Sequence, residues 1–192
     1  MAHALSKNQQ LIQRILRVNH AGEHGAVSIY SAQLKRLSPG AKDLEAWLVE
    51  TVSHEQDHRA AFREAMRPRS AKPCRALSVW SVGGWCLGWM TAMWGRTGIS
   101  ACTAAVERTV HAHLEEQIAF LRRHDTELAA LVERIQSEEH AHLSYAEANL
   151  RSDSLIAGPL TAVIACATDV LIAISTRGDS IRLRYCLRTA LD

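Results

Sequence analysis

The chain has 192 residues, enough for one domain with a sizeable core, and its 47% hydrophobic and 22% charged residues are typical of a globular protein. A net charge of +2 gives no basis for a nucleic-acid partner. The five cysteines are scattered and form no C-x-x-C pair, which argues against a disulfide framework or a zinc site and favours a reducing compartment. The first ten residues resemble neither a signal peptide nor a transit peptide, so we expect a bacterial or already processed protein.

Four segments have the apolar periodicity of amphipathic helices: residues 6–37, 41–66, 100–124 and 125–150. Ser6 is a suitable N-cap for the first of them, and Ser38-Pro39-Gly40 ends it. Gly22 and Gly25 interrupt the same helix, which is understandable if another group approaches its backbone closely there.

Between the second and third helices lies a segment of different character. Residues 76–95 contain no charged residue and four of the five tryptophans. The segment is long enough to span a bilayer. A single span, however, would place the first two helices and the last two on opposite sides of the membrane, so the four could not form one bundle. We therefore interpret residues 76–99 as a crossover lying in the membrane interface, where tryptophan and flanking basic residues are favoured. The alternative is a crossover helix buried against the bundle.

A second apolar segment covers residues 155–175, and we expect a final helix there that packs beside the crossover. The sequence thus predicts an all-α protein, a four-helix bundle with two extra apolar helices. Residues 1–177 form the single domain, and 178–192 form a C-terminal tail.

Two Glu-x-x-His motifs, Glu55/His58 and Glu139/His142, carry the chemistry. Residues three apart share one face of a helix, so each motif presents a carboxylate and an imidazole to a common point. Glu23 precedes the first motif by 32 residues (55 − 23), and Glu107 precedes the second by the same 32 (139 − 107). That spacing brings each lone glutamate back to the level of its motif on an antiparallel neighbour.

Four glutamates and two histidines from four helices are the ligand set of ferritin-like di-iron proteins. The competing interpretation is that these residues are ordinary surface charges. Glu138 precedes Glu139 directly and is a candidate to orient His58 from outside the ligand set. His20 and His24 have a spacing that suits a metal, but we expect them to be solvated or to support the site indirectly.

The residues also carry a family resemblance. Arg17-Val-Asn-His-Ala-Gly-Glu23 resembles the Arg-Val-Asp-His-Ala-Gly-Glu signature of demethoxyubiquinone hydroxylases, the ferritin-like monooxygenases of ubiquinone synthesis. Further blocks of the chain follow in that family's order: Ile29-Tyr30 with Gln33, Glu55-Gln-Asp-His58, Ala101-Cys-Thr-Ala-Ala-Val-Glu107 and Glu138-Glu139-His-Ala-His142. The resemblance extends from about Ile12 to Arg177.

The resemblance implies that two iron ions are bound by six ligands: Glu23, Glu55, His58, Glu107, Glu139 and His142. It implies O₂-dependent hydroxylation of the ring of a polyprenylated demethoxyubiquinol, with electrons from an external reductant. It also implies peripheral attachment to the lipid surface of a membrane, at the cytoplasmic face in bacteria or the matrix face of the mitochondrial inner membrane, and a lipid-binding accessory protein as partner.

The chain departs from the family pattern at two positions. Asn19 replaces an acid, and Leu114 stands where relatives often have tyrosine beside the histidine matched by His113. Three other functions use similar features: an iron-storage or ferroxidase bundle, a di-iron hydroxylase of another lipid or of tRNA, and a membrane-associated helical protein without activity. The apolar crossover favours a lipid substrate over iron storage, and the modest net charge argues against tRNA. A hydroxylase of another lipid and an inactive membrane-associated protein stay as alternatives.

Overall fold

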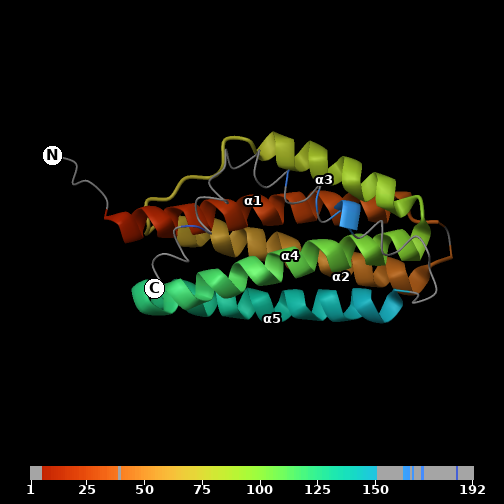
Figure 1. The fold of residues 1–192 in the computed structure, drawn as a ribbon. Coiled ribbons are helices and arrows are strands. Elements are labelled where there is room, and N and C mark those ends of the chain that lie inside the picture. Colours follow the sequence, from red (N-terminus) through yellow and green to blue (C-terminus); the bar gives the residue numbers. More distant parts are fainter. Residues whose placement is uncertain are drawn as a thin grey trace.

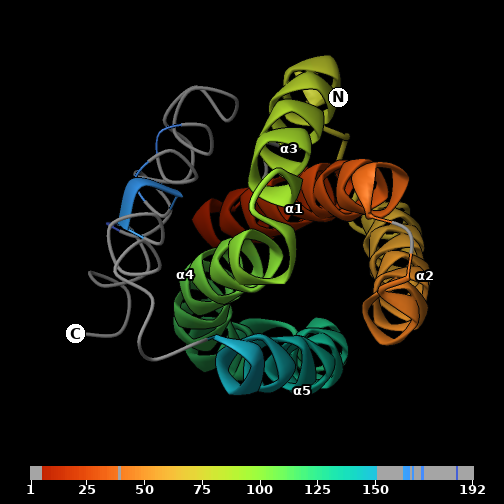
Figure 2. The ribbon, with the colours of Figure 1, turned by 90° about the vertical axis from the view of Figure 1, so that its right-hand side faces the viewer.

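In the computed structural model, the residues described are 6–38, 40–150, 162–164, 166, 170 and 185. They form five long helices: α1 (Lys7–Arg36), α2 (Lys42–Met66), α3 (Leu77–Ala92), α4 (Gly95–His124) and α5 (Thr126–Asn149). Viewed along the bundle, α1, α2, α4 and α5 surround a common centre, and α3 lies outside them against α1 (Figure 1, Figure 2). The predicted all-α ferritin-like bundle with a crossover helix is confirmed.

Two predictions about the C-terminal part fall mainly outside the described residues. These are the final helix over 155–175 and the tail 178–192. Ile164 is described, and its side chain is buried in the same apolar cluster as Tyr30 and Ile99. The division into one domain and a tail stays a prediction.

Two of the five helices, α1 and α5, begin at a residue whose side chain caps them. Ser6 forms a reciprocal capping box with Gln9, in which the Gln9 backbone N–H donates to the Ser6 hydroxyl and the Ser6 N–H donates to the Gln9 side chain. Asp125 caps α5 by accepting from the Leu128 backbone N–H at 3.0 Å. The predicted cap at Ser6 is confirmed.

Two apolar clusters fill the bundle, one towards each end. One contains Ile15, Phe62 and Leu121, and the other contains Leu48 and Ile99 among its fully buried members. On each of α1, α2, α4 and α5, the predicted metal ligands lie between the residues that belong to one cluster and those that pack in the other. The site is therefore a polar layer between two apolar ones, and its geometry is set by well-packed helices on both sides.

α3 packs directly against the backbone of α1. A Cβ atom at Gly88 would lie 2.2 Å from the Ile29 carbonyl oxygen, and one at Gly84 would lie 2.5 Å from that of Gly25. Glycine is required at both positions because any side chain would collide with main-chain atoms. Gly25 in turn lies under the Trp80 ring, which confirms the predicted close approach to the α1 backbone at Gly25. At Gly22 the prediction is wrong, because a Cβ atom there would meet nothing within 4 Å.

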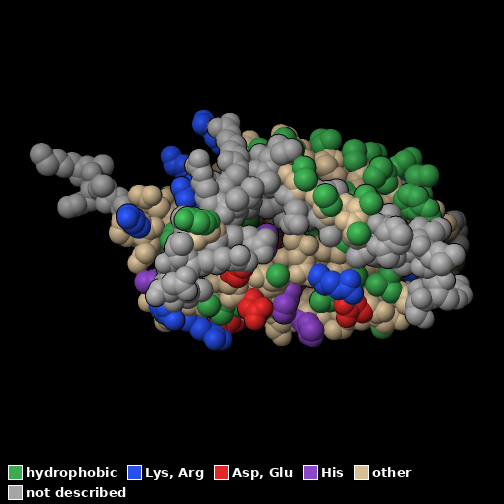
Figure 3. Space-filling view, viewed as in Figure 1, with side chains coloured by type: hydrophobic (Ala, Val, Ile, Leu, Met, Phe, Trp, Pro, Cys, Tyr) green, Lys and Arg blue, Asp and Glu red, His purple; other side chains and the backbone are tan. Residues whose placement is uncertain are grey.

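The opposite face of α3 is apolar and exposed. It presents seven large hydrophobic side chains, counting the turn that follows: Val79, Val82, Trp85, Trp89, Met90, Met93 and Trp94. In Figure 3 hydrophobic side chains gather over the part of the surface where Figure 1 places α3. Neither interpretation of the crossover is complete, because one face is buried on α1 and the other is open. Among the described residues, no helix combines the length and apolarity needed to cross a bilayer.

α4 begins at Gly95, five residues before the predicted start at Ser100 (100 − 95). The apolar run looked continuous in the sequence, but a turn at Met93 and Trp94 divides it. Gly95 has a positive φ of 56°, which permits the sharp change of direction.

The loop after α2 is rich in basic residues, and one of them, Arg69, forms ion pairs at the start of α5. Arg69 donates to both carboxylate oxygens of Asp125 at 2.6 and 2.8 Å and also to Glu127, so it joins the end of α2 to the start of α5. Arg69 is therefore held in ion pairs between α2 and the start of α5.

Candidate metal centre

All six predicted ligands lie together in the centre of the bundle. Each side chain is at most 6% exposed. Their ligand atoms form two overlapping groups, in each of which the atoms lie within 4.8 Å of one another. The first metal position comprises Glu23, Glu55, His58 and Glu139, and the second metal position comprises Glu55, Glu107, Glu139 and His142.

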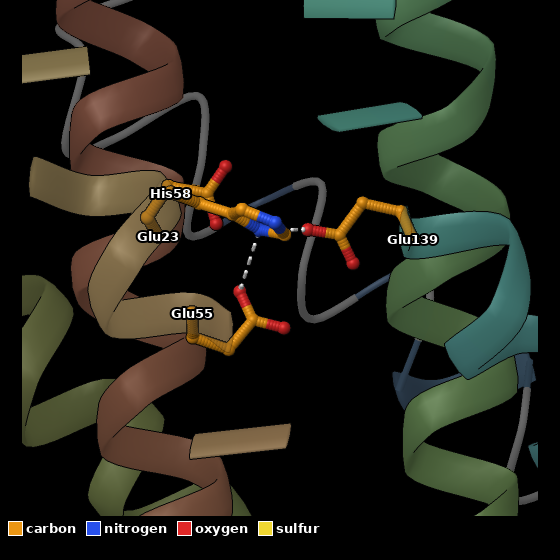
Figure 4. A group of neighbouring side chains, drawn as sticks. All are labelled: Glu23, Glu55, His58 and Glu139. Carbon is orange, nitrogen blue, oxygen red and sulfur yellow. Dashed lines mark hydrogen bonds and ion pairs between the residues drawn. The ribbon is translucent and has the colours of Figure 1, made fainter. Parts of the chain in front are cut away.

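Glu55 and Glu139 belong to both positions, as bridging carboxylates would. His58 Nδ1 lies 2.9 Å from Glu139 Oε1 and 3.9 Å from Glu55 Oε2 (Figure 4). His142 Nδ1 lies 3.1 Å from Glu139 Oε2 and 3.4 Å from Glu55 Oε1. Both imidazoles therefore point the same ring nitrogen at the shared carboxylates.

The electrostatics of this cluster are unfavourable without a cation. Burial, and then neighbouring carboxylates, raise the pKa values of Glu23, Glu55 and Glu107 well above the usual range. Burial also acts to raise the pKa of Glu139, but hydrogen bonds from His142 and His58 outweigh it and lower that pKa to about 2. Burial acts to lower the pKa of His58. The hydrogen bond with Glu139 and the negative charges nearby outweigh burial and raise that pKa to about 9.

The residues fit a pair of divalent metal ions. Both carboxylate oxygens of Glu55 are buried, and neither accepts a hydrogen bond within the described residues. Buried oxygens without donors are costly, and a metal ion between the two groups would satisfy them. Carboxylates with imidazoles suit iron and other first-row metals.

The outer nitrogen of each histidine is also held. His58 Nε2 lies 2.6 Å from Glu138 Oε2, and Arg134 donates to the other oxygen of Glu138 at 2.9 Å. The predicted orienting contact of Glu138 is confirmed. His142 Nε2 lies 3.2 Å from His54 Nδ1, a contact that the sequence interpretation missed. The signal was present, since His54 and Glu138 each directly precede the glutamate of a motif.

Tyr30 is a second residue that was not singled out as part of the site. It is 1% exposed, and its hydroxyl donates to Glu107 Oε1 at 2.5 Å. The available signal was its distance of seven residues from Glu23 (30 − 23), two helical turns along the same face of α1.

His20 and His24 contribute to neither metal position, as expected. His20 is only 4% exposed, so its interpretation as solvated is wrong, and burial followed by the nearby charge of Arg63 lowers its pKa to about 4. His24 lies between helices, with its Nε2 2.7 Å from the Ser81 hydroxyl on α3. Asn19, where the family signature has an acid, forms a reciprocal pair of amide hydrogen bonds with Gln117 on α4.

A narrow pocket leads from the carboxylates towards α3. Four of the glutamates line its inner end: Glu23, Glu55, Glu107 and Glu139. Its walls are mainly apolar side chains of α1, α3 and α4, namely Val18, Ala26, Ile29, Leu87, Val106, Val110 and Leu114. The lining thus combines apolar walls with the glutamates of both candidate metal positions, a combination typical of small-molecule sites.

Comparison with known proteins agrees with this geometry. Residues 10–175 match the family described as "Ubiquinone biosynthesis protein COQ7". The chain belongs to this family. The match includes α2 to α5 entirely and all six clustered ligands.

Individual relatives support the same family. The chain is 35% identical over 142 residues to a mouse (Mus musculus) protein named "NADPH-dependent 3-demethoxyubiquinone 3-hydroxylase, mitochondrial", covering 70% of this chain and 63% of the relative. It is 30% identical over 173 residues to the Dictyostelium discoideum protein of that name, covering 88% and 78%. The bacterial "3-demethoxyubiquinol 3-hydroxylase" of Rhodospirillum rubrum is 35% identical over 139 residues, covering 72% and 65%. The match thus spans just under two thirds of the mouse and Rhodospirillum proteins.

Proposed function

We propose that this protein hydroxylates the ring of a polyprenylated demethoxyubiquinol, using O₂ at a di-iron centre and electrons from an external reductant. The observation that carries the proposal is the pair of candidate metal positions, which share Glu55 and Glu139 and line an apolar pocket. Family membership and the hydroxylase names of relatives from mitochondria and bacteria support the substrate class and the reaction.

Iron held by the six ligands would supply the capacity to activate O₂. The residues of the chain supply the environment for that chemistry. Apolar side chains from α1 and α4 exclude water from the pocket, which strengthens the electrostatic interactions inside it. Tyr30 donates a hydrogen bond to Glu107, and the Asn19–Gln117 pair holds α1 to α4 one helical turn from Glu23.

The decisive experiment is a turnover test. The purified chain is loaded anaerobically with Fe(II), then supplied with a demethoxyubiquinol analogue, a chemical reductant and O₂, and the quinone is analysed by mass spectrometry. We expect an iron-dependent product heavier by one oxygen atom. Oxidation of iron with unmodified quinone would overturn the proposal and favour a ferroxidase or a hydroxylase of another lipid.

We also propose that the exposed face of α3 attaches the protein to a membrane that contains the quinol, the cytoplasmic face of a bacterial cell membrane or the mitochondrial matrix face. Trp85 and Trp89 are 48% and 38% exposed on this face, and the guanidinium of Arg36 lies 4.1 Å from the centre of the Trp89 ring. Tryptophans beside a cation are favoured at the lipid headgroup level. Because α3 also lines the pocket, a polyprenyl tail could stay in lipid while the ring reaches the metal positions.

Liposome flotation tests this attachment. Vesicles containing anionic phospholipid should bind the chain, and the double substitution Trp85→Ser with Trp89→Ser should weaken that binding by on the order of tenfold or more. Val49→Ser removes a similarly exposed apolar side chain from α2 and serves as the control. Equal flotation of all three proteins would contradict the membrane proposal without affecting the hydroxylase.

A further inference from the structure

The two metal positions have matching ligands but unlike supporting residues. The residue before each motif glutamate reaches across the bundle to the histidine of the other motif. On α5, Glu138 holds Nε2 of His58, and on α2, His54 holds Nε2 of His142. The equivalent contact is thus made by a carboxylate at the first metal position and by an imidazole at the second.

The contact of His54 has the geometry of a directed hydrogen bond. The two nitrogens are 3.2 Å apart, and the rings of His54 and His142 are close to parallel, at 14°, with centroids 5.5 Å apart. A histidine that offers Nδ1 to a metal carries its proton on Nε2 and needs an acceptor for it there. His54 Nδ1 is the acceptor in reach of His142, and it fixes both the tautomer and the ring orientation.

A carboxylate acceptor has a stronger effect on a histidine ligand than a neutral one. Glu138 is an anion fixed by Arg134, so it draws the Nε2 proton of His58 towards itself and makes that ring a better electron donor. His54 orients His142 without this additional charge. On this ground alone, the first metal position binds a cation more tightly.

A second contact acts in the same direction. Glu107 belongs only to the second metal position, and one of its oxygens accepts a hydrogen bond from the buried Tyr30 hydroxyl. That bond withdraws electron density from a ligand oxygen. The corresponding residue seven positions after Glu107 is Leu114 (107 + 7), which has no hydroxyl to offer Glu23.

We propose that His54 is a positioning residue for His142. We also propose that the use of an imidazole at this place, where the carboxylate of Glu138 supports His58, makes the two metal positions unequal, so that the position at His58 fills first. This inference rests on the di-iron centre of the proposed function and names the residues that divide it into a tight and a weak half. The class of ligand concerned is a divalent first-row metal ion.

Anaerobic titration of the metal-free full-length chain with Co(II) tests the inference, because the visible bands of Co(II) report its coordination as well as its occupancy. The variants are His54→Leu, which removes the acceptor, His54→Asn, whose side-chain oxygen can replace Nδ1, and His54→Asp, which provides a carboxylate. Glu138→Gln probes the opposite half. His140→Leu is the control, since His140 is exposed on α5 and belongs to neither metal position.

The wild-type chain should bind two Co(II) ions in two separable steps. His54→Leu should weaken the second step by about 10- to 100-fold and alter its visible bands, with the first step unchanged. His54→Asn should restore the second step to within a few-fold, and His54→Asp should bring the two steps together. Glu138→Gln should weaken the first step instead.

The outcomes separate the two proposals. If His54→Leu leaves both binding steps and the spectrum as in the control, the inference about His54 is wrong while the di-iron centre stands. If the wild-type steps are equal and both variants weaken them equally, the assignment of a tight and a weak half is wrong. If the wild-type chain binds no Co(II) and no Fe(II), the proposed function fails together with the inference.

Discussion

The two halves of the site, the hairpin of α1 with α2 and the hairpin of α4 with α5, repeat one arrangement with local differences. Each supplies one glutamate and one Glu-x-x-His motif, and the 32-residue spacing is the same in both. They differ at two equivalent positions. The residue before the motif glutamate is His54 in the first hairpin and Glu138 in the second, and the residue two turns after the lone glutamate is Tyr30 in the first and Leu114 in the second. The clustered glutamates and histidines thus repeat between the two hairpins, whereas the residues that support them differ.

The largest effect is expected where the halves share a ligand. Glu139→Ala removes a carboxylate common to both metal positions, whereas Glu23→Ala removes one from the first position only. We expect Glu139→Ala to lower iron-dependent turnover by more than ~100-fold and to reduce binding at both positions, since even supporting contacts are worth 10- to 100-fold. Bound iron measured by atomic emission, together with turnover, checks this.

Circular dichroism controls for folding in that experiment, and Glu133→Ala on the outer part of α5 is the matched variant. The fold should persist in Glu139→Ala because the apolar clusters on both sides of the site are unchanged. Full turnover by Glu139→Ala would show that the metal positions are assigned wrongly.

A smaller effect, on stability, is expected from changes to the packing of α3 on α1. α3 packs on α1, and a Cβ atom at Gly88 would lie 2.2 Å from the Ile29 carbonyl oxygen. Gly88→Ala should lower the free energy of unfolding by about 1–3 kcal/mol, because backbone atoms must move apart. The midpoint of urea unfolding measures this.

Gly22→Ala is the control for Gly88→Ala. Gly22 also lies within a helix, but a Cβ atom there would have no neighbour within 4 Å. Alanine should therefore leave stability unchanged or raise it by up to ~1 kcal/mol through helix propensity. Similar losses in both variants would rule out the close α3–α1 contact as the cause.

The Tyr30 hydrogen bond should contribute about 1 kcal/mol to stability, with an additional effect on one metal position. Tyr30→Phe leaves Glu107 without this donor, so we expect a modest fall in the unfolding free energy and tighter Co(II) binding in the second step. Tyr145→Phe is the control, since its hydroxyl accepts from Arg96 at 3.4 Å and Tyr145 belongs to neither metal position. Weaker second-step binding in Tyr30→Phe would mean that the hydroxyl mainly orients Glu107.

The smallest effect concerns the ion pair that joins the halves, Arg69 with Asp125. The hydrogen bonds and charge of Arg69 hold the pKa of Asp125 below its usual value. The pair therefore stabilises the fold at pH values above the unfolded pKa, and the contribution is lost as the pH falls through the folded one. Because the pair is partly solvent-screened, we expect Asp125→Asn to cost about 1 kcal/mol or less at neutral pH.

Urea unfolding of Asp125→Asn and wild type, compared at neutral and at acidic pH, measures this contribution. Asparagine can still accept from the Leu128 N–H, so the cap of α5 is preserved. The difference between the two proteins should shrink towards zero in acid. A difference that is constant with pH would show that the charge of Asp125 is not responsible.

The sequence by itself determined much of this protein. Helical periodicity located α1, α2 and α5 to within one or two residues, and the spacing of four glutamates and two histidines indicated the cluster that the structure brings together. Such signals are local, because a helix places residues three, four and seven apart on one face whatever its neighbours are. Glu138 was found for the same reason, being adjacent to a recognised motif.

Only the tertiary structure decided the rest. The turn that separates α3 from α4 depends on Gly95 and on the packing beside it, and the apolar run around it conceals the boundary. The choice of partner for His54 and for Tyr30 depends on which helices lie opposite one another, as does the burial of His20. These contacts join residues far apart in the chain. Spacing within one helix can therefore place His54 or Tyr30 on the face of the site, but it does not give the partner.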